Sequence, residues 1–293
     1  MTPVEKARQH IEAHWQQEQT LELLARESGL SPFHLQRVFK EQTGESPRTY
    51  LERLRLETAA HLLHLRPDLA VQEIAFDCGF SSAAVFARAF QRHYGCSATA
   101  HRARPLEAVA HLASRAVYPA GGLPSAPWSA TEAALLAAVR VQHLDPITVA
   151  YVPTTLVPVG QLVAQFGRLR NQLEAYDSLE SENPPAYGVL YDFPLHTAPH
   201  QCRYRAALRV PPGARLPTRI PRFTIEGGKY AVFALRGGTT DLVRAALVFH
   251  QGWLLESSYV VKAFCCFERF AGVPNAADYE AREREFWVPL RAR

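Results

Sequence analysis

The feature that most constrains the fold of this 293-residue chain is an internal repeat in its first third. Residues 24–31, LARESGLS, are matched by residues 74–81, IAFDCGFS, at a spacing of 50. Residues 35–39, LQRVF, are matched by residues 86–90, FARAF, at a spacing of 51. Such self-similarity indicates two copies of one supersecondary unit. Each copy is predicted to be a short helix, a turn at glycine and a second helix.

Residues typical of helix ends support this interpretation. Ser31 and Ser46 each precede a proline, an arrangement that suits a helix start. Gly44 and Gly95 suit helix ends. Between the two copies, residues 47–64 carry one periodic apolar stripe and predict a long helix. Residues 1–105 are therefore predicted to be an all-helical domain, with two helix-turn-helix units joined by a helix.

The composition and the hydrophobic pattern of the sequence change after residue 105. Residues 118–130 are rich in proline, glycine and serine, so we place a linker at residues 106–135. Residues 136–293 then alternate between strand-like and helical patterns, in an order of strand, helix, strand, strand that appears twice. This order predicts an α+β domain of two pseudo-equivalent halves. The strands are expected at residues 139–152 (around a turn at Asp145-Pro146), 187–193, 202–210, 223–235 (broken at Gly227-Gly228), 263–270 and 285–290, and the helices at 161–176 and 240–255.

Composition and short motifs exclude several classes. With 47% hydrophobic and 20% charged residues, the chain has a globular composition and not a disordered one. Its five cysteines include no CxxC pair, which favours a reducing cytoplasm over a disulfide framework. No apolar run is long enough for a membrane span or a secretory signal. His61 and His64 have no third metal ligand at a usual spacing, and no P-loop or GxGxxG is present, so we expect no metal, no cofactor and no catalytic site.

Residues 4–103 resemble the DNA-binding module of the AraC/XylS regulators. The resemblance is carried by residues 31–44 (SPFHLQRVFKEQTG), 45–51 (ESPRTYL) and 73–80 (EIAFDCGF), together with Phe86, Arg88, Phe90 and Gly95. It implies a bacterial transcription regulator that binds double-stranded DNA through two helix-turn-helix units in one chain, with RNA polymerase as a further candidate partner.

The residues themselves point to the same chemistry. In the helix after Ser31, Leu35 and Phe39 share one face, and polar residues share the opposite one. Glutamine and arginine can make bidentate contacts to adenine and guanine in the major groove. The alternative is an ordinary solvated helix face, and residues 1–105 hold thirteen basic and twelve acidic residues, which is far from a strongly basic footprint. The duplication favours DNA binding, and the predicted contact residues are Ser31, Phe33, Gln36, Arg37, Lys40, Ser82, Ala84 and Arg88.

Residues 138–291 resemble GyrI-like small-molecule-binding domains. The matching pieces, in order, are residues 187–192 (YGVLYD), 202–204 (CRY), 227–233 (GGKYAVF), 253–254 (WL), 267–268 (FE) and 288–290 (VPL). The resemblance implies a groove between two halves that binds organic, often cationic, molecules. The expected function is therefore effector-controlled regulation of transcription.

Glu268 stands out in this domain. Strand alternation places it on one sheet face with Phe264, Cys266 and Phe270. A carboxylate among apolar neighbours needs a partner. That partner is either a ligand cation boxed by aromatic rings or an arginine of the domain, such as Arg203 or Arg205.

Aromatic side chains supply the predicted pocket walls, although ordinary core packing is the other interpretation of each. They are Tyr191, Tyr230, Trp253, Tyr259 and Trp287. Two further functions stay open at this point. The domain could hydrolyse its ligand with Glu268 as general base, or it could serve only for contacts between macromolecules.

Overall fold

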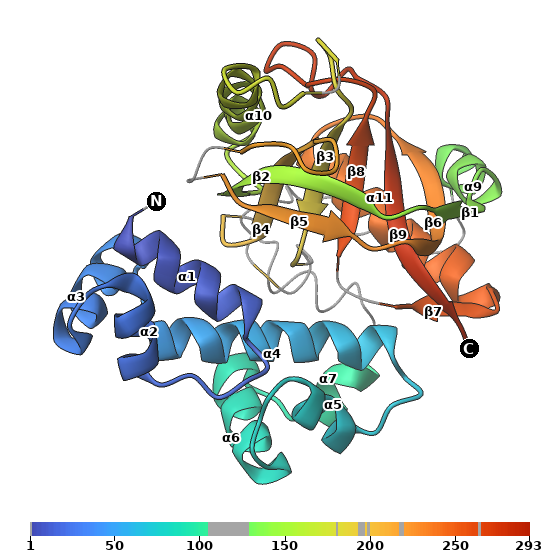
Figure 1. Ribbon diagram of the computed structural model, residues 1–293. Helices are drawn as coiled ribbons and strands as arrows, with labels where there is room; N and C mark the ends of the chain where they lie inside the picture. The colour runs from blue at the N-terminus through green and yellow to red at the C-terminus, as the bar shows by residue number, and fades with distance from the viewer. Residues whose placement is uncertain are drawn as a thin grey trace. The chain divides into compact units, whose positions relative to one another are not determined.

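The computed structural model describes residues 2–104, 129–179, 181–192, 197, 200–216, 220–262 and 265–293. The chain divides into two compact units, Met1–Pro105 and Leu106–Arg293 (Figure 1). Most of the predicted linker, residues 106–135, lies outside the described residues. Its last part is not linker-like, because Ser129 caps helix α9 (Ala130–Ala137) and Glu132 completes a capping box.

The first unit is all-helical, as the repeat predicts. Serine hydroxyls at Ser31, Ser46 and Ser82 accept hydrogen bonds from the first turns of their helices, and Gly44 and Gly95 end two helices in the left-handed conformation. The pairs α2–α3 and α5–α6 form the two helix-turn-helix units. The helices are α1 (Pro3–Ala13), α2 (Leu21–Ser28), α3 (Pro32–Thr43), α4 (Pro47–Leu65), α5 (Val71–Asp77), α6 (Ala83–Tyr94) and α7 (Ala98–Ala103).

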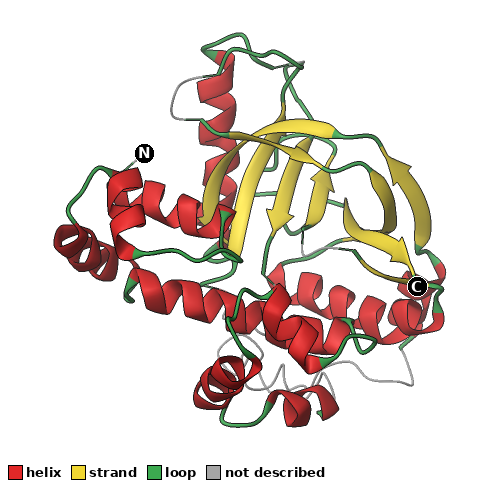
Figure 2. Cartoon of the chain, turned by 60° about the horizontal axis from the view of Figure 1, so that its bottom comes forward, coloured by secondary structure: helices red, strands yellow, loops and turns green. Residues whose placement is uncertain are grey.

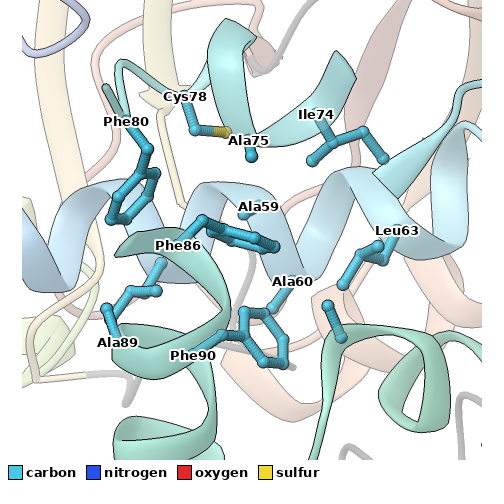
Figure 3. Packing of buried hydrophobic residues seen from close by; sticks show 12 residues of the cluster. Ala59, Ala60, Leu63, Ile74, Ala75, Cys78, Phe80, Phe86, Ala89 and Phe90 are labelled. Carbon is cyan, nitrogen blue, oxygen red and sulfur yellow. The ribbon is translucent and has the colours of Figure 1, made fainter. Parts of the chain in front are cut away.

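Helix α4 belongs to the cores of both helix-turn-helix units. Its Leu51 and Leu54 pack in the first core with Leu35 and Phe39 of α3. Further along, its residues enter the second core, where Phe86 and Phe90 of α6 lie against them (Figure 3). One rigid helix therefore fixes the positions of α3 and α6 within this unit.

The second unit combines a curved sheet with helices. Two halves of the predicted order are present, β2–α10–β3–β4 and β6–α11–β8–β9, the second with the short strand β7 inserted between α11 and β8. Helix α11 continues into a π-helical turn, His250–Leu254. The remaining bounds are β1 (Arg140–Leu144), β2 (Ile147–Thr155), α10 (Val159–Glu174), β3 (Ala186–Leu190), β4 (Arg203–Arg209), β5 (Arg222–Ile225), β6 (Gly228–Leu235), α11 (Thr239–Phe249), β7 (Tyr259–Val261), β8 (Cys266–Phe270) and β9 (Arg284–Ala292).

The strand order is β1-β6-β9-β8-β3-β4-β2-β5, and β7 pairs with β9. Each end strand is joined by a very short connection to a strand near the opposite end of the sheet. Strand β1 runs into β2 through Asp145-Pro146, and β5 runs into β6 through Glu226-Gly227. The pairing keeps one register across both connections, since Leu144 opposes Gly228 and Ile147 opposes Ile225. The two ends of the sheet therefore belong to one bent two-stranded ribbon, and the sheet curls (Figure 2).

Gly227 is required at the bend of this ribbon. A Cβ atom at this position would lie 2.9 Å from Cδ of Pro146 and 3.1 Å from the carbonyl oxygen of Leu144. Both distances are shorter than ordinary van der Waals contact. The break in the strand pattern at Gly227-Gly228 is thus the bend that brings the sheet ends together.

The sheet has two chemically different faces. Residues directly opposite each other in antiparallel strands point to the same face. The registers therefore show to which face of the sheet each paired residue points. On the first face, helix residues Phe166 and Phe249 contact Phe270 and Phe233; we call it the helix face. The opposite face carries Tyr151, Tyr187, Tyr230, Phe267 and Trp287 in one buried cluster, and we call it the aromatic face.

Candidate DNA interface and ligand cavity

Helix α3 presents the predicted residues to solvent. Its start is fixed by Ser31, whose hydroxyl accepts a hydrogen bond from the backbone N–H of His34 at 3.3 Å. Leu35 and Phe39 are fully buried, and Gln36, Arg37 and Lys40 are exposed. Phe33 is 81% exposed, which is unusual for so large an apolar side chain.

Helix α6 is the second copy of this arrangement. Ser82 caps it, and Ala84 and Arg88 are exposed. Because the recognition segments repeat at a spacing of 51, Arg88 occupies the position of Arg37. Val85, which the sequence analysis did not select, is 39% exposed. The repeat could have identified it, because its counterpart His34 is also exposed.

Charge placement distinguishes α3 and α6 from the first helix of each helix-turn-helix unit. Helices α2 and α5 have Glu22 and Glu73 in their first turns, whereas the first turns of α3 and α6 contain no acidic residue. A helix N-terminus without an acid favours an approaching anion. Arg37 forms an exposed ion pair with Glu41 at 2.8 Å, which is weak and easily exchanged for a phosphate or a base.

Acidic residues of this unit are engaged elsewhere. Arg53 binds Glu45 at 2.7 Å and Glu57 at 3.1 Å, and all three side chains are largely buried. Arg92 pairs with Glu52 of α4. The near-neutral total charge of the unit therefore hides a local excess of basic groups on α3 and α6.

A cavity of about 220 Å³ lies in the second unit, where the bent ribbon meets β3, β7, β8 and β9. Two predicted wall residues, Tyr191 and Tyr230, are brought together in it. The other lining residues were not predicted, and most come from the ribbon bend, whose position depends on long-range strand pairing. They are Phe223, Thr224, Glu226, Gly227, Gly228, Lys229, Lys262, Cys265 and Pro289.

Arg205 of β4 lies beside this cavity on the aromatic face. Its guanidinium is 4.2 Å from the ring centre of Tyr191, 4.3 Å from that of Tyr151 and 5.0 Å from that of Phe223. It also donates a hydrogen bond to the hydroxyl of Tyr191 at 2.6 Å. The guanidinium of Arg205 therefore occupies a cage formed by three aromatic rings of the same domain. Strand alternation could have indicated this half-buried charge, but not its ring partners.

The phenols and the thiol at the cavity are uncharged near neutral pH. Burial is the main cause that raises the pKa of the Tyr191 and Tyr230 hydroxyls well above the ordinary range. Burial also raises the pKa of the Cys265 thiol to about 11. Among the described residues that line the cavity, the charged ones are Glu226, Lys229 and Lys262, and Arg205 lies in the adjacent aromatic cage.

Glu268 does not lie at this cavity. As predicted, it shares a face of β8 with Cys266 and Phe270, and Phe264 lies outside the described residues. That face is the helix face, since Glu268 opposes Phe286 and not Trp287. Its side chain is fully buried and is paired with Arg284, so the ion-pair alternative describes the arrangement in the structure.

The partner of Glu268 differs from the two arginines considered. Arg284 Nε donates to Oε1 at 2.5 Å, and the hydroxyls of Tyr204 and Tyr279 donate to Oε2 at 2.8 and 3.4 Å. Arg203 instead binds Asp192 at 2.7 Å, and Arg205 faces the other side of the sheet. The physical reason is that successive residues of a strand point to opposite faces of the sheet. Tyr204 points toward Glu268, so Arg203 and Arg205 on either side of it point to the other face.

The remaining predicted wall residues are spread over the domain. Trp287 is buried on the aromatic face and stacks on Phe267 with ring centres 5.6 Å apart. Tyr259 is not part of the cavity lining, and the Lys229 ammonium lies 5.8 Å from its ring centre. Trp253 stacks between Phe249 and Tyr259 and is not part of the cavity lining.

A second cavity, of about 330 Å³, is lined by residues of β8, β9 and the loops that flank them, with Arg284 among them. Neither of these two cavities has Glu268 in its lining. Of the helices within the described ranges, none is long and apolar enough to cross a membrane.

Comparison with known proteins gives a family match for each of the two units. Residues 24–104 match the model of a helix-turn-helix domain, and residues 137–291 match that of the GyrI-like small molecule binding domain. The second match covers more than half of the chain. The chain belongs to the GyrI-like family. Its N-terminal unit is a helix-turn-helix domain of the AraC type.

Three relatives illustrate these matches. The HTH-type transcriptional activator RhaS of Escherichia coli O139:H28 is 39% identical over 87 residues, which are 30% of this chain and 31% of RhaS. The chain thus spans about a third of the length of the curated relatives it matches. The DNA-binding domain of AdpA, solved with a target DNA, is 29% identical over 40% of this chain and all of that one, with a TM-score of 0.34. SAV2435, solved with tetraphenylphosphonium, is 16% identical over 52% of this chain and 93% of its own, with a TM-score of 0.36.

Proposed function

We propose that this GyrI-like protein regulates transcription by binding double-stranded DNA through α3 and α6 and a small organic effector through its second unit. The observation that supports DNA binding best is the matched pair Arg37 and Arg88. Each lies on the exposed face of the second helix of a helix-turn-helix unit, at the same position of the repeat. That helix is the one that enters the major groove in such motifs.

The shared helix α4 suggests how both units engage one site. Because α4 is part of both cores, α3 and α6 move together and do not depend on a second chain for their spacing. Successive major grooves on one face of the duplex are ~34 Å apart. We expect a monomer to protect about two helical turns of a non-palindromic site.

The two helices differ in what they offer to bases. Helix α3 exposes Gln36 and Arg37, which can donate hydrogen bonds to base edges, and Phe33, which can contact a thymine methyl group. Helix α6 exposes Ala84, Val85 and Arg88. Hydrogen-bonded readout should therefore concentrate in the half-site at α3, and apolar contacts should dominate the other half.

A gel-shift titration on a site selected from random DNA tests this assignment. Arg37→Ala should cost ~1–3 kcal/mol of binding free energy and relax the preference at one base position. Arg88→Ala should weaken binding with a smaller loss of preference. Lys6→Ala is the matched control, because it removes the same charge from the exposed surface of α1. Equal affinity and equal base preference in all three variants would refute the proposal.

Effector binding, and not catalysis, fits the second unit best. Both carboxylate oxygens of Glu268 already accept hydrogen bonds from Arg284, Tyr204 and Tyr279. A general base needs a free oxygen within hydrogen-bond reach of its substrate or of a water. Incubation of the protein with bound compounds, followed by mass spectrometry, checks that no product forms. A regulator at a promoter also meets RNA polymerase, and a direct contact between them stays a prediction.

A further inference from the structure

A row of residues across neighbouring strands forms one wall of the cavity of about 220 Å³. Tyr230 of β6 opposes Pro289 of β9. The backbone N–H of Lys262 donates to the carbonyl oxygen of Pro289 at 2.8 Å, which continues the β7–β9 register by one residue. Opposed residues of antiparallel strands point to the same face, so the Lys262 side chain lies on the aromatic face with the ring of Tyr230. Two apolar groups and one cation therefore share this wall.

The ribbon bend forms a second wall, and it carries a carboxylate. The lining residues from this bend include Phe223, Thr224, Glu226 and Gly227. The backbone carbonyl oxygen of Glu226 accepts a hydrogen bond from the Tyr230 hydroxyl at 2.7 Å, which holds the bend against the first wall. The Glu226 carboxylate binds the Lys262 ammonium at 3.0 Å. This ion pair therefore connects the two walls.

Lys229 also lines the cavity, but its charge is directed elsewhere. Strand alternation along β6 places its side chain on the helix face, and its ammonium lies 5.8 Å from the ring centre of Tyr259. Arg205 lies in the adjacent cage and is not among the described lining residues. Of the charged groups in the described lining, those that lie on the cavity side are therefore the carboxylate of Glu226 and the ammonium of Lys262.

The exposure of this ion pair determines which ligand charges suit it. The side chains of Lys262 and Glu226 are 46% and 74% exposed, so the pair adds little to stability and each partner can be exchanged. An anion that binds Lys262 comes close to the Glu226 carboxylate, and a cation that binds Glu226 comes close to the Lys262 ammonium. Like charges at such distances repel. A ligand with both charges gives each side chain a partner of opposite sign.

The rest of the described lining suits a single aromatic ring. Phe223, Tyr230 and Pro289 supply apolar surface. The Tyr191 hydroxyl and the Cys265 thiol are uncharged near neutral pH, because burial raises the pKa of both groups. The volume of about 220 Å³ is smaller than the ~300–1,000 Å³ typical of pockets for drug-sized ligands. A compound with one ring matches this volume better than a polycyclic one.

We propose that the cavity binds a zwitterion with one aromatic ring, of the class of the aromatic amino acids. The ring lies against Tyr230 and Phe223, the ligand carboxylate pairs with Lys262, and the ligand ammonium pairs with Glu226. This rests on the proposed effector-binding function and specifies its ligand. The family resemblance led to the expectation of an aromatic or cationic ligand, and the proposal keeps the ring and adds a carboxylate to the cation.

Calorimetric titration of the full chain with L-phenylalanine, phenethylamine and 3-phenylpropionate tests the proposal. The three share a ring and a two-carbon spacer. Phenethylamine lacks the carboxylate and is a cation at neutral pH, and 3-phenylpropionate lacks the ammonium. Phenylalanine should bind about tenfold more tightly than either, as expected for the gain of one charge-assisted hydrogen bond.

Two variants assign each ligand charge to its partner. Lys262→Gln should weaken phenylalanine and 3-phenylpropionate about tenfold and should not weaken phenethylamine. Glu226→Gln should weaken phenylalanine and phenethylamine and should not weaken 3-phenylpropionate. Glu174→Gln is the matched control, because it removes one charge from the exposed ion pair with Arg170 on α10, and it should alter none of the three affinities. Both cavity residues are exposed, so their variants should keep the melting temperature of the unmodified protein.

The contradicting results separate the ligand class from the proposed function. Phenethylamine binding as tightly as phenylalanine would overturn the charge assignment but leave effector binding intact. Equal losses of all three compounds in Lys262→Gln would do the same. Binding of none of the three would refute the ligand class, and a thermal-shift screen of other small compounds would then test effector binding by itself. The DNA titration with Arg37→Ala is independent of all these results.

Discussion

At the residue scale, we expect the buried pair of Glu268 and Arg284 to contribute to stability and not to ligand choice. Both side chains are fully buried, and Arg284 also donates to the carbonyl oxygen of Gly237 at 2.9 Å. Removing one charge of such a pair leaves the other buried without a counter-charge. Glu268→Gln should lower the free energy of unfolding by about 3–5 kcal/mol, measured by urea denaturation.

A neighbouring glutamate provides the control for this prediction. Glu285 pairs with Arg140 and Arg269 on partly exposed side chains, so Glu285→Gln should cost about 1 kcal/mol or less. Effector binding by the folded Glu268→Gln protein should be unchanged. Selective loss of ligand binding without loss of stability would instead place Glu268 in the ligand site.

At the element scale, the bend of the β1–β2 and β5–β6 ribbon controls both the sheet closure and the cavity. Gly227 lines the cavity and also contacts Pro146 across the ribbon. A methyl group at this position must push the two bends apart. Gly227→Ala should therefore destabilise the domain by about 1–3 kcal/mol.

The same substitution elsewhere should have the opposite effect. In helix α10, a Cβ at Gly167 would meet no atom within 4 Å. Alanine favours a helix over glycine by about 1 kcal/mol, so Gly167→Ala should stabilise the domain. Thermal unfolding of the two variants side by side measures the difference. Equal melting temperatures would show that the bend tolerates a side chain.

At the scale of the whole molecule, the balance of charge predicts how DNA binding responds to salt. The chain has a net charge of +4, and besides Arg37, which is assigned to bases, its exposed basic groups on or beside the recognition helices include Lys40, Arg48, Arg88 and Arg92. About four phosphate contacts give a slope of about −4 in a plot of log K against log salt, or a roughly 100-fold loss between 50 and 200 mM. Fluorescence anisotropy at several KCl concentrations measures this slope. Arg88→Ala should reduce it by about 1, and an unmodified slope steeper than about −7 would contradict the count.

Local sequence signals predicted most of the elements, because their causes are local. Serine caps, glycine ends and the repeat located helices α2 to α6 of the first unit but not α1 and α7, and alternation located the strands of the second unit except β7. The partners of Glu268 and Arg205 could not be obtained in this way. Arg284 reaches Glu268 only because β9 pairs with β8, and Arg205 meets Phe223 only because β4 and β5 both pair with β2. Such neighbours follow from strand order, which the sequence pattern alone does not specify.

The curled sheet has a consequence for how the protein behaves at high concentration. A long exposed strand at the margin of a sheet offers its unpaired N–H and C=O groups to another chain and promotes aggregation. Here the strand order ends at β1 and β5, which are five and four residues long and begin with Arg140 and Arg222. Each runs directly into a strand at the opposite end of the sheet, so little straight margin is left at these two ends for a second molecule to extend. The bend that shapes the cavity thereby also protects the domain against intermolecular strand pairing.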